Sequence, residues 1–349
     1  MLIDEARSYL DLYLSRSAFF GLNRMVWRST WTKCQNKLEE ERVEGSDEVH
    51  LGKDGWLMLV GGSNDVLSFF VKDNAFPEAT QNEWINLFNK RKTRCDLIGS
   101  KYFHIIVPDK LTIYQEKYRG SLPFADRVPS LCMPAASRKA GLDVIVDIVP
   151  NLLTEKERHK LYWKTDTHWT FEGCYSAFKT LCPYLGVARI PEIDLRPRIK
   201  GSLILDLGGK LNPAIREDYE TVNFIKESKR VAANSIVLFK EMMNREQDGG
   251  LHVGSNVVYC NWSESAIQKT VVLFGDSFSE YRPHLLTGML AETFREVHFI
   301  WSTNVDWTYV ENVKPDYLVT EAAERFMNQV PTDTFNLVSF ETSRLAPLV

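Results

Sequence analysis

The chain has 349 residues, of which 44% are hydrophobic and 25% are charged, and its formal net charge is −4. This composition is typical of a soluble globular protein with one large domain or two smaller ones. The slightly acidic balance provides no basic field for binding nucleic acid. No stretch reaches the ~18 consecutive apolar residues typical of a membrane span, so no membrane insertion is expected.

The first 45 residues have a mostly helical pattern and end in a charged run at residues 39–42. They predict an N-terminal helical extension. The start lacks a basic segment followed by an apolar one, and none of the six cysteines forms a CxxC pair. These features predict a cytoplasmic protein with free thiols, the alternative being a periplasmic protein whose leader has been removed.

The first predicted elements of the main domain are strands and one helix. A glycine-containing turn leads into an apolar strand at residues 56–60, and the helical spacing of apolar residues predicts a helix over 81–98. Two further apolar runs, 102–107 and 142–149, are each followed by a proline and predict strands. Continuous apolar runs are typical of strands buried on both faces of a parallel sheet.

The middle of the chain has a less regular pattern. A helix is predicted over residues 171–185, where apolar residues share one face. Residues 186–269 are interpreted as an irregular insertion with candidate strands at 235–240 and 256–260.

The pattern becomes regular again after Val271. A strand ending near Gly275 is followed by a helix over 285–294 and by strands at 297–301 and 316–320. This βαβ succession predicts a parallel sheet with right-handed crossovers. We therefore expect one catalytic domain over residues 46–335, followed by a tail.

The predicted tail comprises residues 336–349. The chain shows no internal repeat and no low-complexity segment that would indicate another architecture.

The clearest chemical signal is the segment VVLFGDSFS at residues 271–279. A buried strand that stops at Gly275 places Ser277 on the tight turn that follows, a common position for a nucleophile. A serine hydroxyl needs a base within hydrogen-bond reach and an acid that orients the base.

The segment TDTHW at residues 165–169 supplies both groups. In an extended stretch, Asp166 and His168 point to the same side, so the carboxylate can orient the imidazole toward a serine at another strand end. The same Asp-x-His pair is also able to hold a metal, but no further ligand cluster lies near it in sequence. We therefore expect a catalytic Ser277–His168–Asp166 triad and no metal.

Acyl transfer also requires hydrogen-bond donors for the oxyanion. The backbone N–H of Ser277 is one candidate. Gly62 and Asn64, in the turn after the strand at 56–60, are the others, although a plain hairpin turn explains them equally well.

In combination, these motifs resemble the SGNH/GDSL hydrolase superfamily, and in particular the bacterial polysaccharide O-acetyltransferases of the alginate acetylation type. The similar segments occur in the same order as in that branch: 52–57 (GKDGWL), 107–110 (VPDK) with 113–114, 162–170 (YWKTDTHWT), 205–207 (LDL), 275–279 (GDSFS), and 314–317 (KPDY) with Glu321 and 324–325. Ordinary SGNH hydrolases carry Asp-x-x-His after the serine, whereas here the pair precedes it.

The resemblance implies an α/β, flavodoxin-like three-layer sandwich with a mostly parallel central sheet. It also implies O-acetyl transfer through an acyl-serine to a bacterial capsular or surface polysaccharide. The alternatives are a carbohydrate acetylesterase with the same triad and a non-catalytic glycan-binding protein on the same fold. Trp169, Tyr281 and Arg325 are candidate substrate-binding residues, no cofactor is expected to be bound, and acetyl-CoA is a possible donor.

Overall fold

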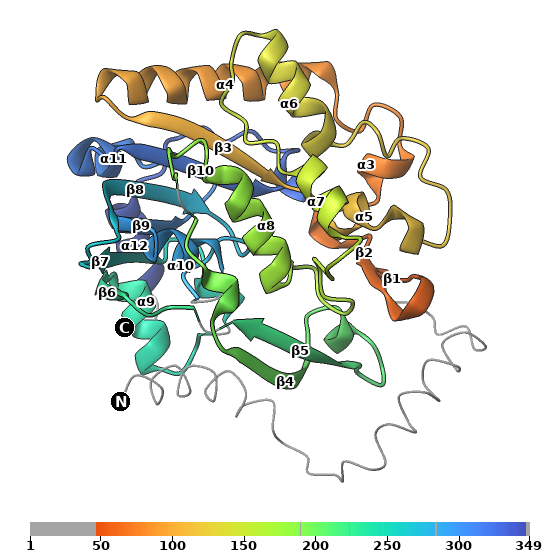
Figure 1. Ribbon diagram of the computed structural model, residues 1–349. Coiled ribbons are helices and arrows are strands. Elements are labelled where there is room, and N and C mark those ends of the chain that lie inside the picture. Colours follow the sequence, from red (N-terminus) through yellow and green to blue (C-terminus); the bar gives the residue numbers. More distant parts are fainter. Residues whose placement is uncertain (1–46, 189, 223, 247, 283–284, 347–349) are drawn as a thin grey trace.

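The computed structural model describes residues 47–346 except 189, 223, 247 and 283–284. Elements are numbered as in Figure 1. The strands are β1 (Val49–Leu51), β2 (Leu57–Leu59), β3 (Lys101–Val107), β4 (Arg198–Ile204), β5 (Arg216–Val222), β6 (Ser228–Ala233), β7 (Asn256–Asn261), β8 (Ile267–Gly275), β9 (Phe294–Trp301) and β10 (Tyr317–Ala323). The α-helices are α3 (Ser68–Val71), α4 (Glu78–Leu97), α5 (Lys110–Ile113), α6 (Pro129–Lys139), α7 (Val149–Glu155), α8 (Phe171–Leu181), α9 (Ser235–Met242), α10 (Leu286–Ala291), α11 (Trp307–Val313) and α12 (Leu337–Leu345).

A six-stranded sheet with the order β3-β10-β8-β9-β7-β6 forms the centre of the fold. β3, β10, β8 and β9 are parallel, whereas β7 and β6 are antiparallel to their neighbours. Residues 271–274 of β8 are fully buried, as expected for a strand covered on both faces. The prediction of a mostly parallel central sheet is confirmed.

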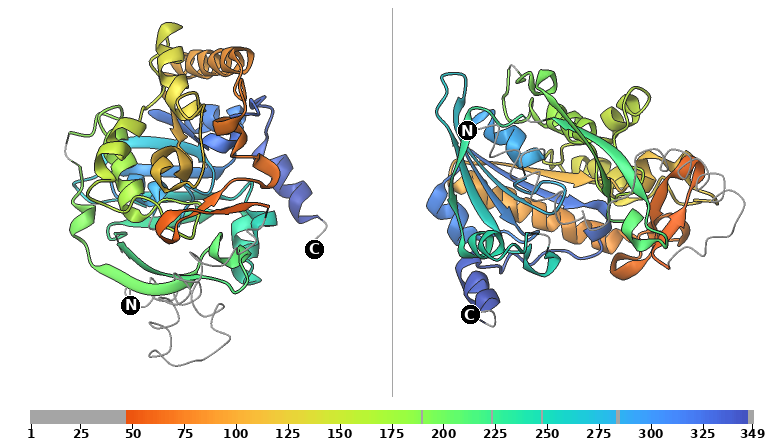
Figure 2. Two further views of the ribbon diagram at one scale, coloured as in Figure 1. Left: turned by 90° about the vertical axis from the view of Figure 1, so that its right-hand side faces the viewer. Right: turned by 90° about the horizontal axis from the view of Figure 1, so that it is seen from below.

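Helices cover both faces of this sheet. Neighbouring side chains on a strand point to opposite faces, so consecutive residues contact different helix layers. On β3, His104 contacts the rings of Trp84 and Phe88 from α4, whereas Phe103 contacts Tyr184 just after α8. Helix α11 lies on the α4 face and α10 lies beside α8. Figures 1 and 2 show the resulting three layers.

Two small hairpins, β1–β2 and β4–β5, lie outside the central sheet (Figure 1). Both attach to the loop that carries the Asp-x-His segment. The N–H of Leu57 in β2 donates to the Lys164 carbonyl at 2.9 Å, and the N–H groups of Leu207 and Gly208 donate to the Thr165 carbonyl at 3.1 and 2.9 Å. The hairpins therefore hold this loop from two sides.

The prediction of a strand over residues 142–149 is wrong. Only Ile145 forms a bridge, to His104 of β3, and the chain then turns into α7. The segment has a strand-like apolar pattern because Val144, Ile145 and Val146 are buried at the sheet edge. Pro150 stands in the first turn of α7, where a missing N–H costs nothing, so this proline begins a helix rather than ending a strand.

The strand predicted over residues 235–240 is also wrong, because these residues form α9. The side chain of Asn234 caps this helix by accepting from the Val237 N–H at 3.3 Å. The predicted strand at 256–260 is confirmed as β7. The region 186–269 is therefore not an irregular insertion, since it supplies the hairpin β4–β5 and two strands of the central sheet.

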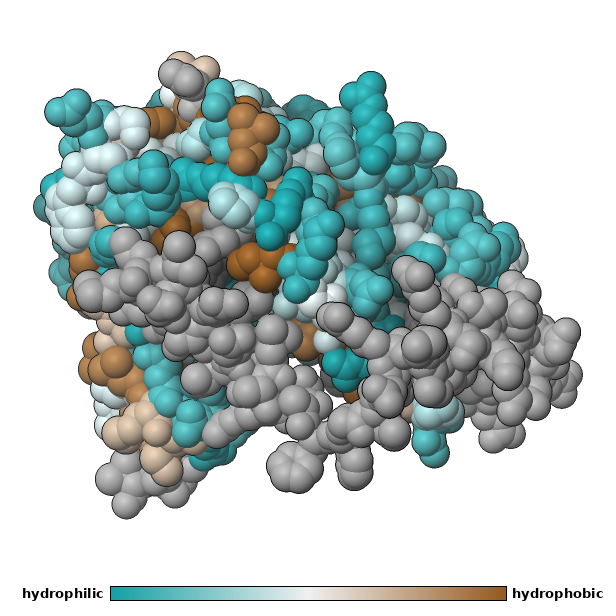
Figure 3. All heavy atoms as spheres, turned by 60° about the horizontal axis from the view of Figure 1, so that its bottom comes forward, coloured by the Kyte–Doolittle hydropathy of each residue, from teal (hydrophilic) through white to brown (hydrophobic). Residues whose placement is uncertain are grey.

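The predicted extension over residues 1–45 lies outside the described residues. Within the predicted tail, Leu337–Leu345 form α12, which packs against α9. None of the helices described is long and apolar enough to cross a membrane. Most coloured residues on the face in Figure 3 are hydrophilic, with hydrophobic side chains in separate small patches.

Candidate active site

The turn after β8 holds Ser277 in a fixed position at the carboxyl edge of the sheet. Asp276 supports this turn with both carboxylate oxygens, since Oδ1 accepts from the Phe278 N–H at 2.9 Å and Oδ2 from the Ala323 N–H of β10 at 2.8 Å. A Cβ on Gly275 would lie 2.8 Å from Glu321 Oε2. The Gly-Asp-Ser sequence is therefore explained locally by tight packing and an aspartate that anchors the turn to the next strand.

The Asp-x-His segment lies in a short loop that is closed by a bridge between Tyr162 and Trp169. Thr170 ends the loop by capping α8, because its hydroxyl accepts from the Gly173 N–H at 3.3 Å. Within the loop, Asp166 Oδ1 accepts from the backbone N–H of His168 at 2.7 Å and lies 2.6 Å from His168 Nδ1. One carboxylate oxygen thus fixes both the backbone and the ring of His168.

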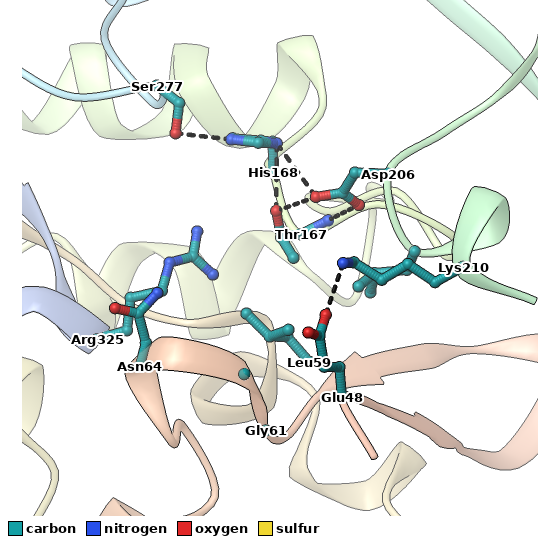
Figure 4. Close-up of a pocket in the computed structure, with 12 residues that line it drawn as sticks. Glu48, Leu59, Gly61, Asn64, Thr167, His168, Asp206, Lys210, Ser277 and Arg325 are labelled. Carbon is teal, nitrogen blue, oxygen red and sulfur yellow. Dashed lines mark hydrogen bonds and ion pairs between the residues drawn. The ribbon is translucent and has the colours of Figure 1, made fainter. Parts of the chain in front are cut away.

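The other ring nitrogen of His168 faces the serine. Nε2 lies 2.8 Å from Ser277 Oγ, and the His168 side chain is 30% exposed (Figure 4). The predicted contacts are both present, at distances suitable for proton transfer.

Electrostatics support a histidine poised to accept a proton. Burial alone would lower the pKa of His168, but the adjacent Asp166 carboxylate outweighs this effect and raises it. Burial would likewise raise the pKa of Asp166, yet the charge and hydrogen bonds of His168 lower it to about 2. Asp166 therefore stays ionised and stabilises a protonated imidazole.

Asp206 also belongs to the site, although the similar segment at residues 205–207 indicated no role for it. Its carboxylate accepts from the N–H of Thr167 at 2.8 Å and from the Thr167 hydroxyl at 2.5 Å. Burial and the neighbouring Asp166 carboxylate raise the pKa of Asp206. Only a residue brought in from another loop supplies this group, so the spacing of residues 165–169 gave no signal for it.

Asp166, His168 and Asp206 also lie close enough together to hold a metal ion. However, Asp166 Oδ1 and His168 Nδ1 already hydrogen-bond each other at 2.6 Å, which occupies two of the required ligand atoms. The arrangement therefore favours acid–base chemistry over metal binding.

A cavity of about 360 Å³ opens in front of the serine (Figure 4). Its walls come from the β1–β2 hairpin, the loop 162–169 that carries the predicted acid and base (the triad loop), the segment after β4, the turn 276–279 that carries the predicted nucleophile (the nucleophile turn), and the segment just after β10. The lining residues are Glu48, Leu59, Gly61, Gly62, Asn64, Thr167, His168, Asp206, Leu207, Lys210, Ser277 and Arg325. Most of these residues are polar or charged, which suits a ligand that carries hydroxyl groups.

The comparisons with known proteins agree with this geometry. Residues 49–196, which include Asp166 and His168, match the family described as "SGNH hydrolase-like domain, acetyltransferase AlgX". The matched segment covers 148 of the 349 residues, so this part of the chain is similar to the AlgX-type acetyltransferases. The predicted resemblance to SGNH hydrolase-like acetyltransferases is confirmed for this segment. No curated protein is similar enough in sequence to match the chain.

Three solved structures share the fold of this chain. The O-acetyltransferase domain of Pseudomonas putida AlgJ has 18% identity and a TM-score of 0.54, over 84% of this chain and 99% of that one. Bacillus cereus PatB1 with a sulfonyl adduct has 12% identity and a TM-score of 0.54, over 80% and 97%. A DHHW family protein from Eubacterium siraeum has 13% identity and a TM-score of 0.53, over 82% and 93%. The predicted SGNH-like α/β fold is confirmed.

The predicted oxyanion residues share one cavity. Gly62 and Asn64 form the short 3-10 helix after β2, and they line the cavity together with Ser277. The Ser277 N–H has no acceptor among the described residues.

Of the three predicted substrate-binding residues, only Arg325 lines the cavity. Its guanidinium pairs with Asp109 at 2.9 Å and lies over the Phe278 ring. This pairing fixes the position of Arg325, which lines the same cavity as Asn64 (Figure 4).

Trp169 and Tyr281 do not line the cavity. Trp169 is 2% exposed and its indole N–H donates to the Phe278 carbonyl at 3.1 Å, so it packs behind the nucleophile turn. The Tyr281 ring packs against Phe299 of β9, and its carbonyl accepts from the Tyr259 hydroxyl at 3.0 Å. Both predictions are wrong for direct substrate contact, because the large rings fill the core beside the site.

Two buried carboxylates to which the sequence assigned no role support the site from outside the cavity. Glu217 of β5 accepts from the Thr165 N–H at 2.8 Å and from the Lys164 N–H at 3.1 Å, so the β4–β5 hairpin holds the triad loop. Glu324 accepts from the Asp109 N–H at 3.0 Å and from the Ser130 N–H at 2.9 Å. These groups position the loop and the Arg325–Asp109 pair without entering the cavity.

Proposed function

We propose that this chain is an O-acetyltransferase that moves an acetyl group, through an acyl-serine on Ser277, onto a hydroxyl group of a bacterial capsular or surface polysaccharide. The observation that carries the proposal is the hydrogen-bonded series Ser277–His168–Asp166 at the wall of a polar cavity. The similarity of residues 49–196 to the AlgX acetyltransferase family supports transfer of an acetyl group.

The first half of the proposed reaction acylates the enzyme. His168 Nε2 removes the proton of Ser277 Oγ as this oxygen attacks the acetyl carbonyl, and a new C–O bond forms. The tetrahedral intermediate carries its negative charge on the former carbonyl oxygen. The intermediate then collapses, the bond to the donor's leaving group breaks, and His168 returns the proton to that group.

The oxyanion of this intermediate needs fixed donors. The backbone N–H of Ser277 lies next to the oxyanion, because it belongs to the residue whose Oγ attacks the carbonyl. The turn that contains Gly62 and Asn64 lines the same cavity. Arg325 adds a positive charge on the same wall, held in place by Asp109. We propose that these groups together stabilise the developing charge.

The second half transfers the acetyl group. A sugar hydroxyl enters the cavity, His168 Nε2 takes its proton, and its oxygen attacks the acetyl-serine carbonyl. The bond to Ser277 Oγ then breaks, and the proton moves from His168 back to the serine, which restores the enzyme. Asp166 remains ionised throughout and stabilises the protonated imidazole in both halves.

Acetyl-CoA is the proposed donor, and the proposed compartment is the cytoplasm, where this thioester is available. The five described cysteines, Cys95, Cys132, Cys174, Cys182 and Cys260, are free, which fits a reducing compartment. A donor other than acetyl-CoA would leave the triad chemistry unchanged.

The test incubates the purified protein with acetyl-CoA or 4-nitrophenyl acetate, with and without candidate polysaccharides. Acetylated sugar that requires Ser277 supports the transferase, and free acetate alone supports an esterase with the same triad. If neither product depends on Ser277 and the protein only binds glycan, the catalytic proposal is wrong. If the ester is used but acetyl-CoA is not, another donor is required.

A further inference from the structure

We propose that Lys110 is a positioning residue that sets the orientation of His168 by holding the loop on which the histidine lies. This inference rests on the proposed function for its readout, because the orientation of His168 is measured through the reactivity of Ser277. Lys110 does not line the main cavity and is not a group that reacts.

All three N–H bonds of the Lys110 ammonium have acceptors in the triad loop. Nζ donates to the carbonyls of Trp163 at 3.0 Å, Lys164 at 3.0 Å and Asp166 at 2.7 Å. An ammonium has three donors and no acceptor, so these contacts use its full capacity. Three carbonyls that converge on one nitrogen curl the loop around it and fix the path of the chain into Asp166 and His168.

Lys110 itself is anchored to the central sheet. It begins α5 directly after β3 ends at Val107, and it is 4% exposed, which is rare for a lysine. The Tyr162 hydroxyl donates to the Pro108 carbonyl at 2.5 Å and adds a second contact between the loop and this strand end. The loop is therefore registered to the same sheet edge that carries the nucleophile turn.

The charges around the ammonium explain why a cation is used at this position. The carboxylates of Asp166, Asp206 and Glu217 attract it, and the guanidinium of Arg325 repels it. Burial nevertheless lowers the pKa of Lys110 to about 8. At neutral pH the ammonium is charged, and above that value the nitrogen keeps two N–H donors and loses the third.

A merely structural role and a positioning role differ in what a substitution changes. If Lys110 only stabilised the fold, its loss would lower thermal stability while folded molecules reacted normally. Lys240 is a matched control for this, since it is 1% exposed, its pKa is also lowered to about 8 by burial, and it contacts Ser255 Oγ and the Tyr281 hydroxyl at 3.4 Å outside the cavity.

The experiment measures how fast an aryl sulfonyl fluoride modifies Ser277, by intact mass, in the wild type and in Lys110→Met, Lys110→Arg and Lys240→Met. Rates are compared at a temperature where each variant is folded by circular dichroism. We expect Lys110→Met to react about 10²-fold more slowly, the usual effect of a misplaced catalytic group of about 1 Å. Lys110→Arg should recover part of this rate, and Lys240→Met should stay within about 3-fold of the wild type, as expected for a site with no shared partner.

The pH dependence of the modification rate provides a second readout, which does not depend on a variant that could fail to fold. The wild-type rate should fall above about pH 8 as Lys110 loses its proton. In Lys110→Arg this alkaline decline should move to higher pH, because a guanidinium keeps its charge. The contribution of Lys110 to the free energy of unfolding rises over the same pH range, since its folded pKa lies below its unfolded value, so unfolding does not cause the decline.

Three results would overturn the inference: Lys110→Met reacts like the wild type, Lys240→Met loses as much rate as Lys110→Met, or the alkaline decline is the same in Lys110→Arg. If Lys110→Met does not fold, the pH profiles of the wild type and Lys110→Arg decide. Ser277→Ala separates this inference from the proposed function. If Ser277→Ala is modified as fast as the wild type, the proposed function fails whatever Lys110 does.

Discussion

Replacing Asp166 by asparagine should separate its charge from its geometry. Asp166 Oδ1 accepts both hydrogen bonds from His168, at 2.7 and 2.6 Å, whereas Oδ2 accepts only from the Asp206 N–H at 3.4 Å. An asparagine with its oxygen in the Oδ1 position keeps both contacts to His168. Its amide nitrogen would face only the distant Asp206 N–H. Asp166→Asn therefore preserves the orientation of the ring and removes the negative charge.

The magnitude follows from the coupling between the two groups. Although burial alone would raise it, the charge and hydrogen bonds of His168 lower the pKa of Asp166 from 3.8 to about 2. This net shift, with burial included, favours the ionised carboxylate by about 2 kcal/mol, which sets the scale of the expected rate loss at roughly 30-fold to 100-fold. Because Asp166 raises the pKa of His168, the charge loss should also move the acid decline in rate to lower pH.

The assay is the pre-steady-state release of 4-nitrophenol from 4-nitrophenyl acetate between pH 5 and 9. Asp166→Ala should lose about 10-fold more rate than Asp166→Asn, because it also releases the ring. Asp306→Asn is the control, since Asp306 is a buried helix-capping carboxylate on α11, outside the cavity. The reasoning fails if Asp166→Asn reacts as fast as the wild type, if its acid decline stays in place, or if it is no better than Asp166→Ala.

Three further predictions concern the nucleophile turn and the far side of the sheet. Ser277→Ala should form no acetyl-enzyme by intact mass and keep the wild-type melting temperature, because the only side-chain hydrogen bond of Ser277 within the described residues is to His168; an acetylated Ser277→Ala protein would disprove the covalent route. Gly275→Ala should lower the free energy of unfolding in urea by about 1–3 kcal/mol and slow the acylation, since its methyl group would press on Glu321 and Ser279; wild-type stability and rate would contradict the packing argument. Asp333→Ala should destabilise the fold by about 3–5 kcal/mol, because it strands the buried Arg91 guanidinium that Asp333 now pairs with at 2.7 Å; folded molecules should still react with the sulfonyl fluoride at the wild-type rate, and a large rate loss would show that the two regions are coupled.

The sequence predicted the elements that have a strong local signal. The buried run before Gly275 and the two-residue spacing of Asp166 and His168 were sufficient to predict the strand, the turn and the Ser277 contact, because these depend on short-range rules. The strands at 142–149 and 235–240 failed, since short apolar runs do not distinguish a buried loop or helix from a strand. Asn234 was the available signal for a helix, as a capping residue before α9.

The other residues of the site could not be predicted from the sequence, because tertiary contacts bring them together. Lys110 and Glu217 hold the triad loop from positions more than 50 residues away, and neither the segment 107–110 nor the residues around Glu217 indicated this role. Trp169 shows the opposite case, in which a residue beside the histidine looks available for a sugar but packs into the core. Only the sheet topology decides which of these side chains reach the cavity.

The two contacts of His168 differ greatly in how far apart their partners are along the chain. The acid is 2 residues away, whereas the serine is 109 residues away. The acid–base pair is thus maintained by a single loop, but the alignment of the base with the nucleophile depends on that loop staying docked to the sheet. Local openings of proteins cost less free energy than global unfolding. On mild heating or in low denaturant, this enzyme should therefore lose serine reactivity before it loses secondary structure, while the acid–base pair persists longest.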